Sequence, residues 1–162
     1  MSLRQSCLVP VQRIACSLLS PHFSTMTTVP PPLLACNVYI SEGQNDECIR
    51  RLEAEARDKD SSTSALVHVF QDRPYNRTGF TLAGQTASVH EAALAIVGAS
   101  IRAIDLSRQS GSHPRIGAVD HVSVHPLQDA SLSEAGAAAA SLARDIGSLL
   151  QGGSTFSSHT VI

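Results

Sequence analysis

Hydrophobic and polar positions follow two periods along the chain, one of about 3.6 residues, typical of helices, and one of about two residues, typical of strands. Segments that alternate or are continuously apolar predict strands at Leu33–Ile40, Ser64–Gln71, Thr78–Ala83 and Val119–Leu127. Segments with helical spacing predict helices at Glu47–Arg57, Ser88–Gln109 and Ala135–Leu150. The predicted order of elements is therefore β-α-β-β-α-β-α.

The first six predicted elements have the order of a split βαβ unit. This order predicts the α+β class, as a ferredoxin-like βαββαβ sandwich with its helices on one face of an antiparallel sheet. The last element adds one extra C-terminal helix. With 162 residues, of which 43% are hydrophobic and only 4% aromatic, the chain has the size of one domain with an aliphatic core.

Polar residues at the predicted boundaries suggest how the helices begin and end. Asn45 or Asp46 is expected to cap the first helix. Ser88, followed by Glu91 three residues later, has the spacing of a capping box for the second. Gly111 follows the end of that helix, and residues 129–133 are expected to cap the third. The second helix is expected to turn its apolar side to the core, with Leu94, Val97, Ile101 and Ile104.

The N-terminal segment, residues 1–32, contains no acidic residue, because the first carboxylate of the chain is Glu42. This pattern is typical of a mitochondrial transit peptide. The alternative is a disordered segment, with translation from Met26 giving a cytoplasmic protein. Three prolines end the segment, so we expect one domain at residues 33–151 and a short tail at residues 152–162.

Charge and cysteine usage exclude several classes of partner. Lys and Arg together number 12 against 14 Asp and Glu, and no basic patch indicates nucleic acid. No apolar run reaches the roughly 18 residues of a membrane span. The four cysteines show no CxxC pairing and are expected to be free thiols. His68, His121 and His125 suggest a metal set, but they lack a fourth ligand at a telling spacing, so no metal is expected.

The candidate chemistry lies in the segment 111–120, between the second helix and the last strand. Pro114 fixes its own φ and favours an extended His113, which puts the imidazole on a short rigid joint at the edge of the sheet. A general base needs such a mount. The alternative is a turn histidine held by backbone groups.

The segment His-Pro-Arg-Ile-Gly-Ala-Val-Asp at residues 113–120 resembles the His-Pro-Arg-Met-Gly-Ala-Leu-Asp segment of formiminotransferases. Residues 104–108 match a family Ile-Asp-Met-Ser-Arg, residues 76–78 match its Asn-Arg-Thr, and residues 41–43 match its first Ser-Glu-Gly. The resemblance runs in one order from about Leu33 to Leu150. It covers only the N-terminal subdomain of those enzymes, so we expect a truncated, stand-alone subdomain.

The resemblance implies the same ferredoxin-like fold and the transfer of a formimino group from formiminoglutamate to tetrahydrofolate, a step of one-carbon metabolism and histidine degradation. It implies that His113 is the catalytic base. Arg115 and Arg77 are candidate contacts for a substrate carboxylate, and Asn76 offers a donor and an acceptor beside them. Asp120 is expected to pair with Arg115 or to orient an imidazole. For Arg115 and Asp120 the alternative is a surface charge.

Two departures from the family pattern leave two hypotheses open. Where the family has an Asp-Val-Asp strand end, one of whose carboxylates works with the catalytic histidine, this chain has His68, Val69 and Phe70. The family's Pro-Asn-Phe is Val-Tyr-Ile at residues 38–40. The chain is therefore either a folate-dependent transferase, active alone or as a homodimer, or a catalytically inactive binding or dimerisation module. A carboxylate within hydrogen-bond reach of the base would favour the enzyme, and uncovered apolar surface predicts a homodimer or a protein partner.

Overall fold

The computed structural model describes residues 31–59 and 62–150. The predicted targeting or disordered segment, apart from its last two residues, and the predicted tail at residues 152–162 lie outside the described residues. The seven predicted elements are all present, and they make an α+β structure. Its strands are β1 (Leu33–Ile40), β2 (Ser64–Asp72), β3 (Arg77–Gln85) and β4 (Val119–Leu127). Its helices are α1 (Asp46–Arg57), α2 (Thr86–Ala103) and α3 (Leu132–Leu150), with a 3-10 turn, η1 (Leu106–Arg108), after α2.

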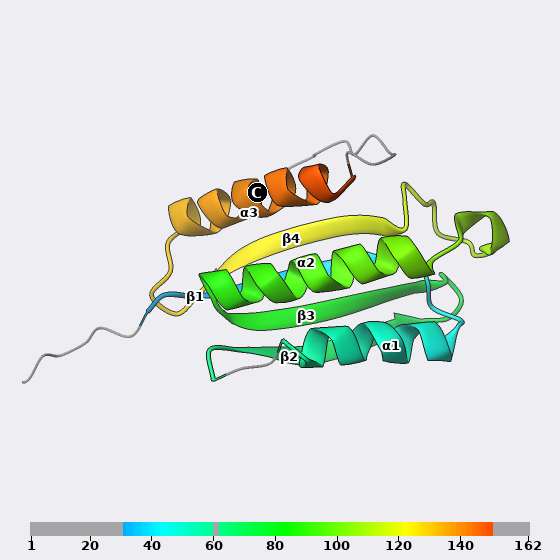
Figure 1. Cartoon of the computed structure of the whole chain (residues 1–162), viewed down its shortest axis with the longest axis horizontal. Helices are drawn as coiled ribbons and strands as arrows, with labels where there is room; N and C mark the ends of the chain where they lie inside the picture. The colour runs from blue at the N-terminus through cyan, green and yellow to red at the C-terminus, as the bar shows by residue number, and fades with distance from the viewer. Residues whose placement is uncertain (1–30, 60–61, 151–162) are drawn as a thin grey trace, which may run out of the picture.

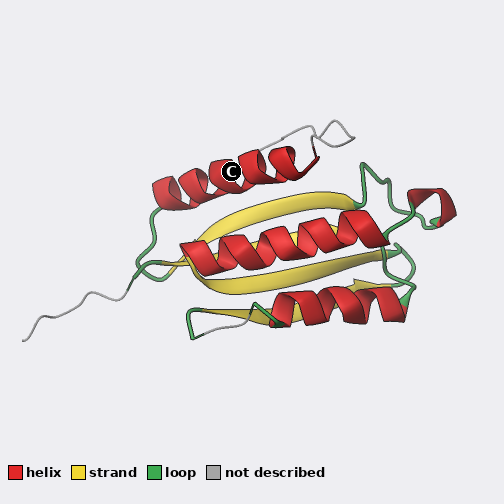
Figure 2. Ribbon diagram, viewed as in Figure 1, coloured by secondary structure: helices red, strands yellow, loops and turns green. Residues whose placement is uncertain are grey.

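The four strands form one antiparallel sheet in the order β2-β3-β1-β4. Figures 1 and 2 show the three helices in a single layer on one face of this sheet, with α2 between α1 and α3. Helix α3 packs against β4 and α2, and α1 packs against α2 and β2. Within the described residues, the other face of the sheet carries no helix. We call it the open face.

The core fills the space between the sheet and the helix layer. Strand β1 alternates regularly, and its even-numbered side chains, Leu34, Cys36, Val38 and Ile40, are buried under the helices. The core is mainly aliphatic, and Phe80 is its largest fully buried side chain. Burial raises the pKa of the Cys36 thiol to about 12, because the apolar surroundings disfavour the thiolate.

Helix α1 begins as the sequence predicts, and α2 does not. The side chain of Asn45 accepts a hydrogen bond from the backbone N–H of Cys48 at 3.1 Å, which is an N-cap contact. The capping box predicted for Ser88 is wrong, because α2 begins at Thr86 and the Ser88 hydroxyl instead bonds the hydroxyl of Thr63 at 2.8 Å. The close hydroxyl contact links the start of α2 to the turn before β2.

The predicted end of the second helix at Gln109 is also wrong. Helix α2 ends at Ala103, and Ile104 takes an extended conformation with φ −93° and ψ 118°. Asp105 then accepts a hydrogen bond from the backbone N–H of Ser107 at 3.0 Å and starts η1. Ile104 is nevertheless buried, as expected, so the helical spacing of apolar residues continued past the helix itself.

The packing of α2 explains which of its apolar residues are in the core. Val97 and Ile104 are buried, whereas Leu94 and Ile101 are only partly buried. Leu94 lines an outer groove of about 670 Å³ over the helix layer. The buried face of the helix combines the larger Val89, Ile96 and Val97 with four small residues, namely Ala92, Ala93, Ala99 and Ser100. Small side chains let α2 lie close to the sheet between its two neighbours.

Helix α3 begins with a capping box formed by Ser131 and Glu134. Ser131 lies within the segment 129–133 that was expected to cap this helix. The hydroxyl of Ser131 accepts a hydrogen bond from the N–H of Glu134 at 3.2 Å, and Glu134 accepts one from the N–H of Ser131 at 2.7 Å. The backbone bond from Ser131, and then the bond from its hydroxyl, lower the pKa of Glu134. Ser131 and Glu134 therefore start the third helix.

The described residues contain neither a membrane-spanning helix nor a metal-binding group of side chains. No helix there is long and apolar enough to cross a membrane. Across residues 31–59 and 62–150, no three His, Cys, Asp or Glu side chains are grouped so that they could hold a metal ion.

Candidate functional site

Three loops meet at one end of the sheet, on the right in Figure 1. They are the turn after β1 (residues 41–45), the turn between β2 and β3 (residues 73–76) and the segment between α2 and β4 (residues 104–118). The predicted catalytic and substrate-binding residues, His113, Arg115, Arg77, Asn76 and Asp120, lie in or beside these loops. Two groups of contacts hold these residues in place. One is buried and polar and centres on Asn76 and Glu42, and the other lies at the open face and centres on Arg77.

Asn76 joins the three loops. Its backbone has a positive φ of 53°, and its side chain is almost fully buried. Oδ1 accepts the backbone N–H of Gly43 at 2.7 Å, and Nδ2 donates to the carbonyl of Ser110 at 2.8 Å and to the side chain of Gln109. Asn76 thus holds the site together with both of its polar side-chain atoms. Its role as a substrate contact remains a prediction.

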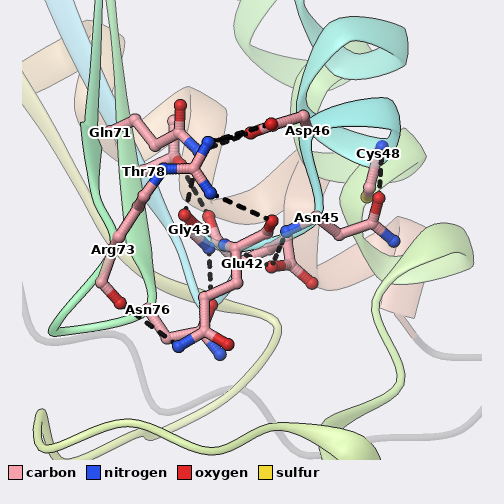
Figure 3. Close-up of polar contacts among 10 residues, drawn as sticks. Glu42, Gly43, Asn45, Asp46, Cys48, Gln71, Arg73, Asn76 and Thr78 are labelled. Atoms are coloured by element: carbon pink, nitrogen blue, oxygen red, sulfur yellow. Dashed lines mark hydrogen bonds and ion pairs between the residues drawn. The ribbon is translucent and has the colours of Figure 1, made fainter.

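Glu42 is the buried carboxylate of this end. Its Oε1 accepts the backbone N–H groups of Gln44 at 2.8 Å and Asn45 at 2.9 Å, and its Oε2 accepts the amide of Gln109 at 2.5 Å. Its backbone carbonyl accepts the hydroxyl of Thr78 at 2.6 Å. Figure 3 shows Glu42, Asn45 and Thr78 close together around the turn after β1. In the sequence, only the match to the family's Ser-Glu-Gly segment points to Glu42 as a site residue.

Glycines allow the loops to approach one another closely. A Cβ on Gly43 would lie 2.4 Å from the backbone nitrogen of Arg77 and 2.5 Å from the carbonyl oxygen of Asp72. A Cβ on Gly111 would lie 2.7 Å from the carbonyl oxygen of Tyr75. Real Cβ atoms do not come so close to backbone atoms, so a larger residue at Gly43 or Gly111 would force the loops apart.

A surface ion pair closes one side of this end. Arg73 donates to both carboxylate oxygens of Asp46, at 2.7 and 2.9 Å, and Gln71 donates to Oδ1 at 2.9 Å (Figure 3). The hydrogen bonds from Arg73 and then from Gln71 lower the pKa of Asp46. Because these side chains are exposed, the pair fixes geometry more than it adds stability.

His113 faces Arg77 across the open face. Its Nε2 lies 3.2 Å from Nη1 of Arg77, and its Nδ1 lies 2.6 Å from the carbonyl oxygen of Pro114. A guanidinium only donates and a carbonyl only accepts. The imidazole therefore carries its proton on Nδ1 and accepts at Nε2. The ring of Tyr75 lies 5.5 Å away from that of His113, tilted by 45°.

Arg77 has three neighbours in addition to backbone. Its guanidinium carbon lies 4.5 Å from the centre of the Tyr39 ring, and its Nε lies 3.8 Å from Oδ2 of Asp120. Oδ1 of Asp120 accepts backbone N–H groups of Ile116 at 3.2 Å and Gly117 at 3.5 Å. The structure thus brings Asp120, Arg77 and His113 into one row.

The hypothesised pairing of Asp120 with Arg115 is wrong, because the ion pair that Asp120 makes is with Arg77. Arg115 instead donates Nη2 to the carbonyl of Gly111 at 3.2 Å and holds its own loop. Asp120, which was also expected to orient an imidazole, makes no hydrogen bond with His113. Asp120 approaches it only through Arg77, and Oδ1 of Asp72 accepts the backbone N–H of Tyr75 at 2.9 Å.

Several polar atoms around this row are buried without a hydrogen bond in the described structure. They are Nε of Arg77, Nε of Arg115, Oδ2 of Asp120 and Oγ of Ser41. Buried polar atoms are nearly always bonded in folded proteins, and exceptions gather at functional sites. The row therefore offers a donor and an acceptor that a ligand can satisfy.

Comparisons with known proteins all point to one family. The model of the formiminotransferase domain, N-terminal subdomain, matches residues 33–159. A formiminotransferase cyclodeaminase-like protein of Arabidopsis thaliana is 38% identical over 121 residues, which is 72% of this chain and 40% of the relative. A glutamate formimidoyltransferase of Streptococcus pyogenes serotype M1 is 35% identical over 63% of this chain and 33% of the relative.

The formimidoyltransferase-cyclodeaminase of Sus scrofa is 32% identical over 63% of this chain, but over only 18% of its own length. The matched part is thus between 18% and 40% of the length of these three relatives. In each of them the similarity is to one part of a longer protein. The match of the domain model over residues 33–159 covers most of the chain, and the chain therefore belongs to the formiminotransferase family, in which it corresponds to the N-terminal subdomain.

Proposed function

We propose that this chain binds formiminoglutamate and tetrahydrofolate and takes part in formimino transfer between them. The family and the name of the Streptococcus pyogenes relative, a glutamate formimidoyltransferase, support this proposal. The observation that carries it is the row of Asp120, Arg77 and His113, in which a neutral imidazole with an accepting Nε2 stands beside a guanidinium.

The chemistry of the reaction needs one base. The attacking amine of tetrahydrofolate forms a bond to the formimino carbon and loses a proton, while the bond from that carbon to the glutamate nitrogen breaks. The departing amine of glutamate takes up a proton. A neutral imidazole can accept the first proton and deliver the second, and in the proposal His113 does both.

Arg77 links substrate binding to the base. Its Nη1 donates to Nε2 of His113, so in the unliganded chain the lone pair needed for proton transfer is occupied. A substrate carboxylate is a stronger acceptor than an imidazole, because it is charged and can bind both arms of the guanidinium. We therefore assign Arg77 to a carboxylate of glutamate or of the folate tail. When the guanidinium turns toward that carboxylate, Nε2 is released.

The remaining predicted residues take supporting roles in this proposal. Arg115 lies four residues after Gly111, bonds its carbonyl, and presents a second guanidinium near the same end. Asp120 keeps Arg77 close by charge, with an Oδ2 that has no hydrogen bond. Asn76 holds the loops that carry both arginines. We assign Arg115 to a second carboxylate and Asp120 and Asn76 to the shape of the site.

A second candidate function is a catalytically inactive binding or dimerisation module. It is favoured by one observation, namely that no described carboxylate lies within hydrogen-bond distance of His113, whereas Arg77 does. A base without an acidic partner is less well stabilised once it is protonated. In this case the loops keep their structure and the chain binds a ligand or a second copy through the open face.

The finer description of the fold belongs to the same proposal. The sheet order β2-β3-β1-β4, with both βαβ helices on one face, is the order expected of a ferredoxin-like sandwich. We assign residues 33–151 to this domain, with α3 as its extra helix. A second subunit, or another part of a longer protein, would complete the site by covering the open face.

Calorimetric titration of the full chain with formiminoglutamate, and separately with tetrahydrofolate, tests the proposal. We expect binding by the unchanged chain and a loss of about tenfold or more in affinity for formiminoglutamate in Arg77→Lys, because lysine cannot bind a carboxylate with two arms. The matched control is Arg51→Lys, which changes an arginine that pairs with Glu47 on the surface of α1. We expect the control to bind as the unchanged chain does.

The same titrations separate the two candidate functions. Binding of both ligands, followed by transfer that is lost in His113→Gln, supports the enzyme. Binding without transfer supports the inactive module. If the unchanged chain binds neither ligand at millimolar concentration, the proposed ligands are wrong.

A further inference from the structure

The open face carries Tyr39, an aromatic residue that in the sequence stands out only as a departure from the family pattern. Tyr39 stands on β1, one of the two central strands, and it is paired in register with Gly79 on β3 and with His121 on β4. Residues paired in this way point to the same face of the sheet. Tyr39 therefore lies in the middle of the open face, beside the row of Asp120, Arg77 and His113.

The neighbouring glycine decides where the Tyr39 ring goes. A Cβ on Gly79 would lie 2.7 Å from Cε1 of Tyr39 and 3.0 Å from Cδ1, so the ring rests against the bare backbone of β3. On the other side the ring of His121 lies 6.1 Å away, tilted by 43°. The ring thus leans from β1 over β3. Arg77 is on the same face of β3, two residues before Gly79.

The ring of Tyr39 contacts the guanidinium of Arg77. The guanidinium carbon lies 4.5 Å from the ring centre, a distance at which a cation and an aromatic face attract each other. The carboxylate of Asp120 is 3.8 Å from Nε, too far for a hydrogen bond, and Nε has none. Charge keeps Arg77 near Asp120, but charge alone does not fix the orientation of a guanidinium.

We propose that Tyr39 is a positioning residue, which holds the guanidinium of Arg77 against the open face so that Nη1 reaches Nε2 of His113. Gly79 is needed for this positioning, since any side chain at that residue would push the Tyr39 ring away. Tyr39 touches neither the imidazole of His113 nor the substrate in this account, and it acts through Arg77. Its consequence for ligand binding rests on the proposed function, whereas its effect on Arg77 and His113 does not.

Nitrogen-15 NMR of the full chain tests the inference without any ligand. The signals to follow are Nε–H of Arg77, which lies near the face of an aromatic ring, and Nε2 of His113, which shifts when it accepts a hydrogen bond. Arg77→Lys and His113→Gln assign them. We expect Tyr39→Phe to keep both signals, because phenylalanine also attracts a cation through its ring face. We expect Tyr39→Ala and Gly79→Ala to move both.

Phe70→Ala is the matched control, since Phe70 is another aromatic residue paired with Gly79, from β2, and is 54% exposed. It should leave both signals unchanged. The inference is overturned if Tyr39→Ala leaves Arg77 and His113 as they are in the unchanged chain. It is also overturned if Tyr39→Phe behaves as Tyr39→Ala does, because then the aromatic face is not what matters.

A second measurement tests whether the contact between Tyr39 and Arg77 affects ligand affinity. In titrations with formiminoglutamate, Tyr39→Ala should bind about 2- to 30-fold more weakly than Tyr39→Phe, the range that a cation–π contact gives. Equal binding by the two variants would contradict the role in binding. If no variant binds, including the unchanged chain, the proposed function fails and the NMR signals still decide the role of Tyr39.

Discussion

The side chain of Asn76 and the backbone of Gly43 are joined by a buried hydrogen bond of 2.7 Å across 33 residues of sequence. This bond connects the turn after β1 to the turn between β2 and β3. Since Asn76 also donates to Ser110, the loop that carries His113 is fixed to the same point. The geometry of the candidate site therefore depends on a small buried network of hydrogen bonds centred on Asn76.

Asn76→Ala should destabilise the protein by about 2–4 kcal/mol, because it leaves buried partners unsatisfied and puts alanine at a positive φ. Asn76→Gly separates the two effects, since glycine accepts the backbone conformation and lacks only the side chain. Urea unfolding of both variants measures the difference. If Asn76→Ala and Asn76→Gly are equally stable, the positive φ contributes nothing.

Gly43→Ala should destabilise by about 1–3 kcal/mol, since its Cβ would overlap backbone atoms of Arg77 and Asp72, which cannot move without opening the site. Gly136→Ala is the matched control. Gly136 is exposed within α3, where a Cβ meets nothing, and alanine should stabilise the helix by about 0.5–1 kcal/mol. Thermal unfolding should shift in opposite directions for the two variants, and a shift in the same direction would refute the account.

The stability of the fold should fall as the pH rises from about 9 to about 12 because of Cys36. In the unfolded chain this thiol loses its proton near the ordinary pKa of 9.0, whereas burial raises the pKa to about 12 in the folded protein. Above pH 9 the unfolded state therefore binds fewer protons, and the free energy of unfolding decreases by up to about 1.4 kcal/mol per pH unit.

Cys36→Ala removes this term while its packing cost stays the same at every pH, so the variant should lose less stability than the parent chain between pH 8.5 and 10.5. Urea unfolding at several pH values measures the two slopes. Parallel slopes would show that the Cys36 thiol does not titrate differently in the two states. Other groups that titrate in this range contribute equally to both proteins.

Acid should weaken the start of α3. The bonds from Ser131 lower the pKa of Glu134 in the folded protein, so their contribution is complete above the ordinary pKa of 4.5 and is lost as the pH falls through the lowered value. Ser131→Ala removes the hydroxyl, which accepts the N–H of Glu134 and donates to its carboxylate, and leaves the backbone N–H of residue 131 in place. It should cost about 1 kcal/mol at neutral pH. Hydrogen exchange of the first turn of α3 should be faster in Ser131→Ala, and unchanged exchange would contradict the capping box.

The sequence predicted the order of the elements and a cap of α1 at Asn45 or Asp46, because these depend on local spacing. It failed where a tertiary contact overruled the local pattern. Ser88 bonds Thr63 instead of capping α2, and Ile104 is buried although the helix has already ended. Periodicity reports which residues are buried, and it does not report the backbone conformation that buries them.

Within the site, the segment 111–120 and Arg77 were predicted as candidates, but their contact was not. Arg77 and His113 are 36 residues apart, and only the folded sheet brings them together. The role of Tyr39 was hidden for the same reason, since it depends on the register of β1 against Gly79. The sequence signals that could have found it are an aromatic residue in a central strand and a glycine in its neighbour.

The most direct test of the account is to follow Nε2 of His113 by nitrogen-15 NMR while the unchanged full chain is titrated with formiminoglutamate. The account predicts that the substrate carboxylate draws Arg77 away, so that the Nε2 signal moves toward that of an imidazole without a hydrogen-bond donor and reaches a plateau. A ligand that binds while the Nε2 signal stays in place would contradict the account, because the base would remain occupied by Arg77 in the complex.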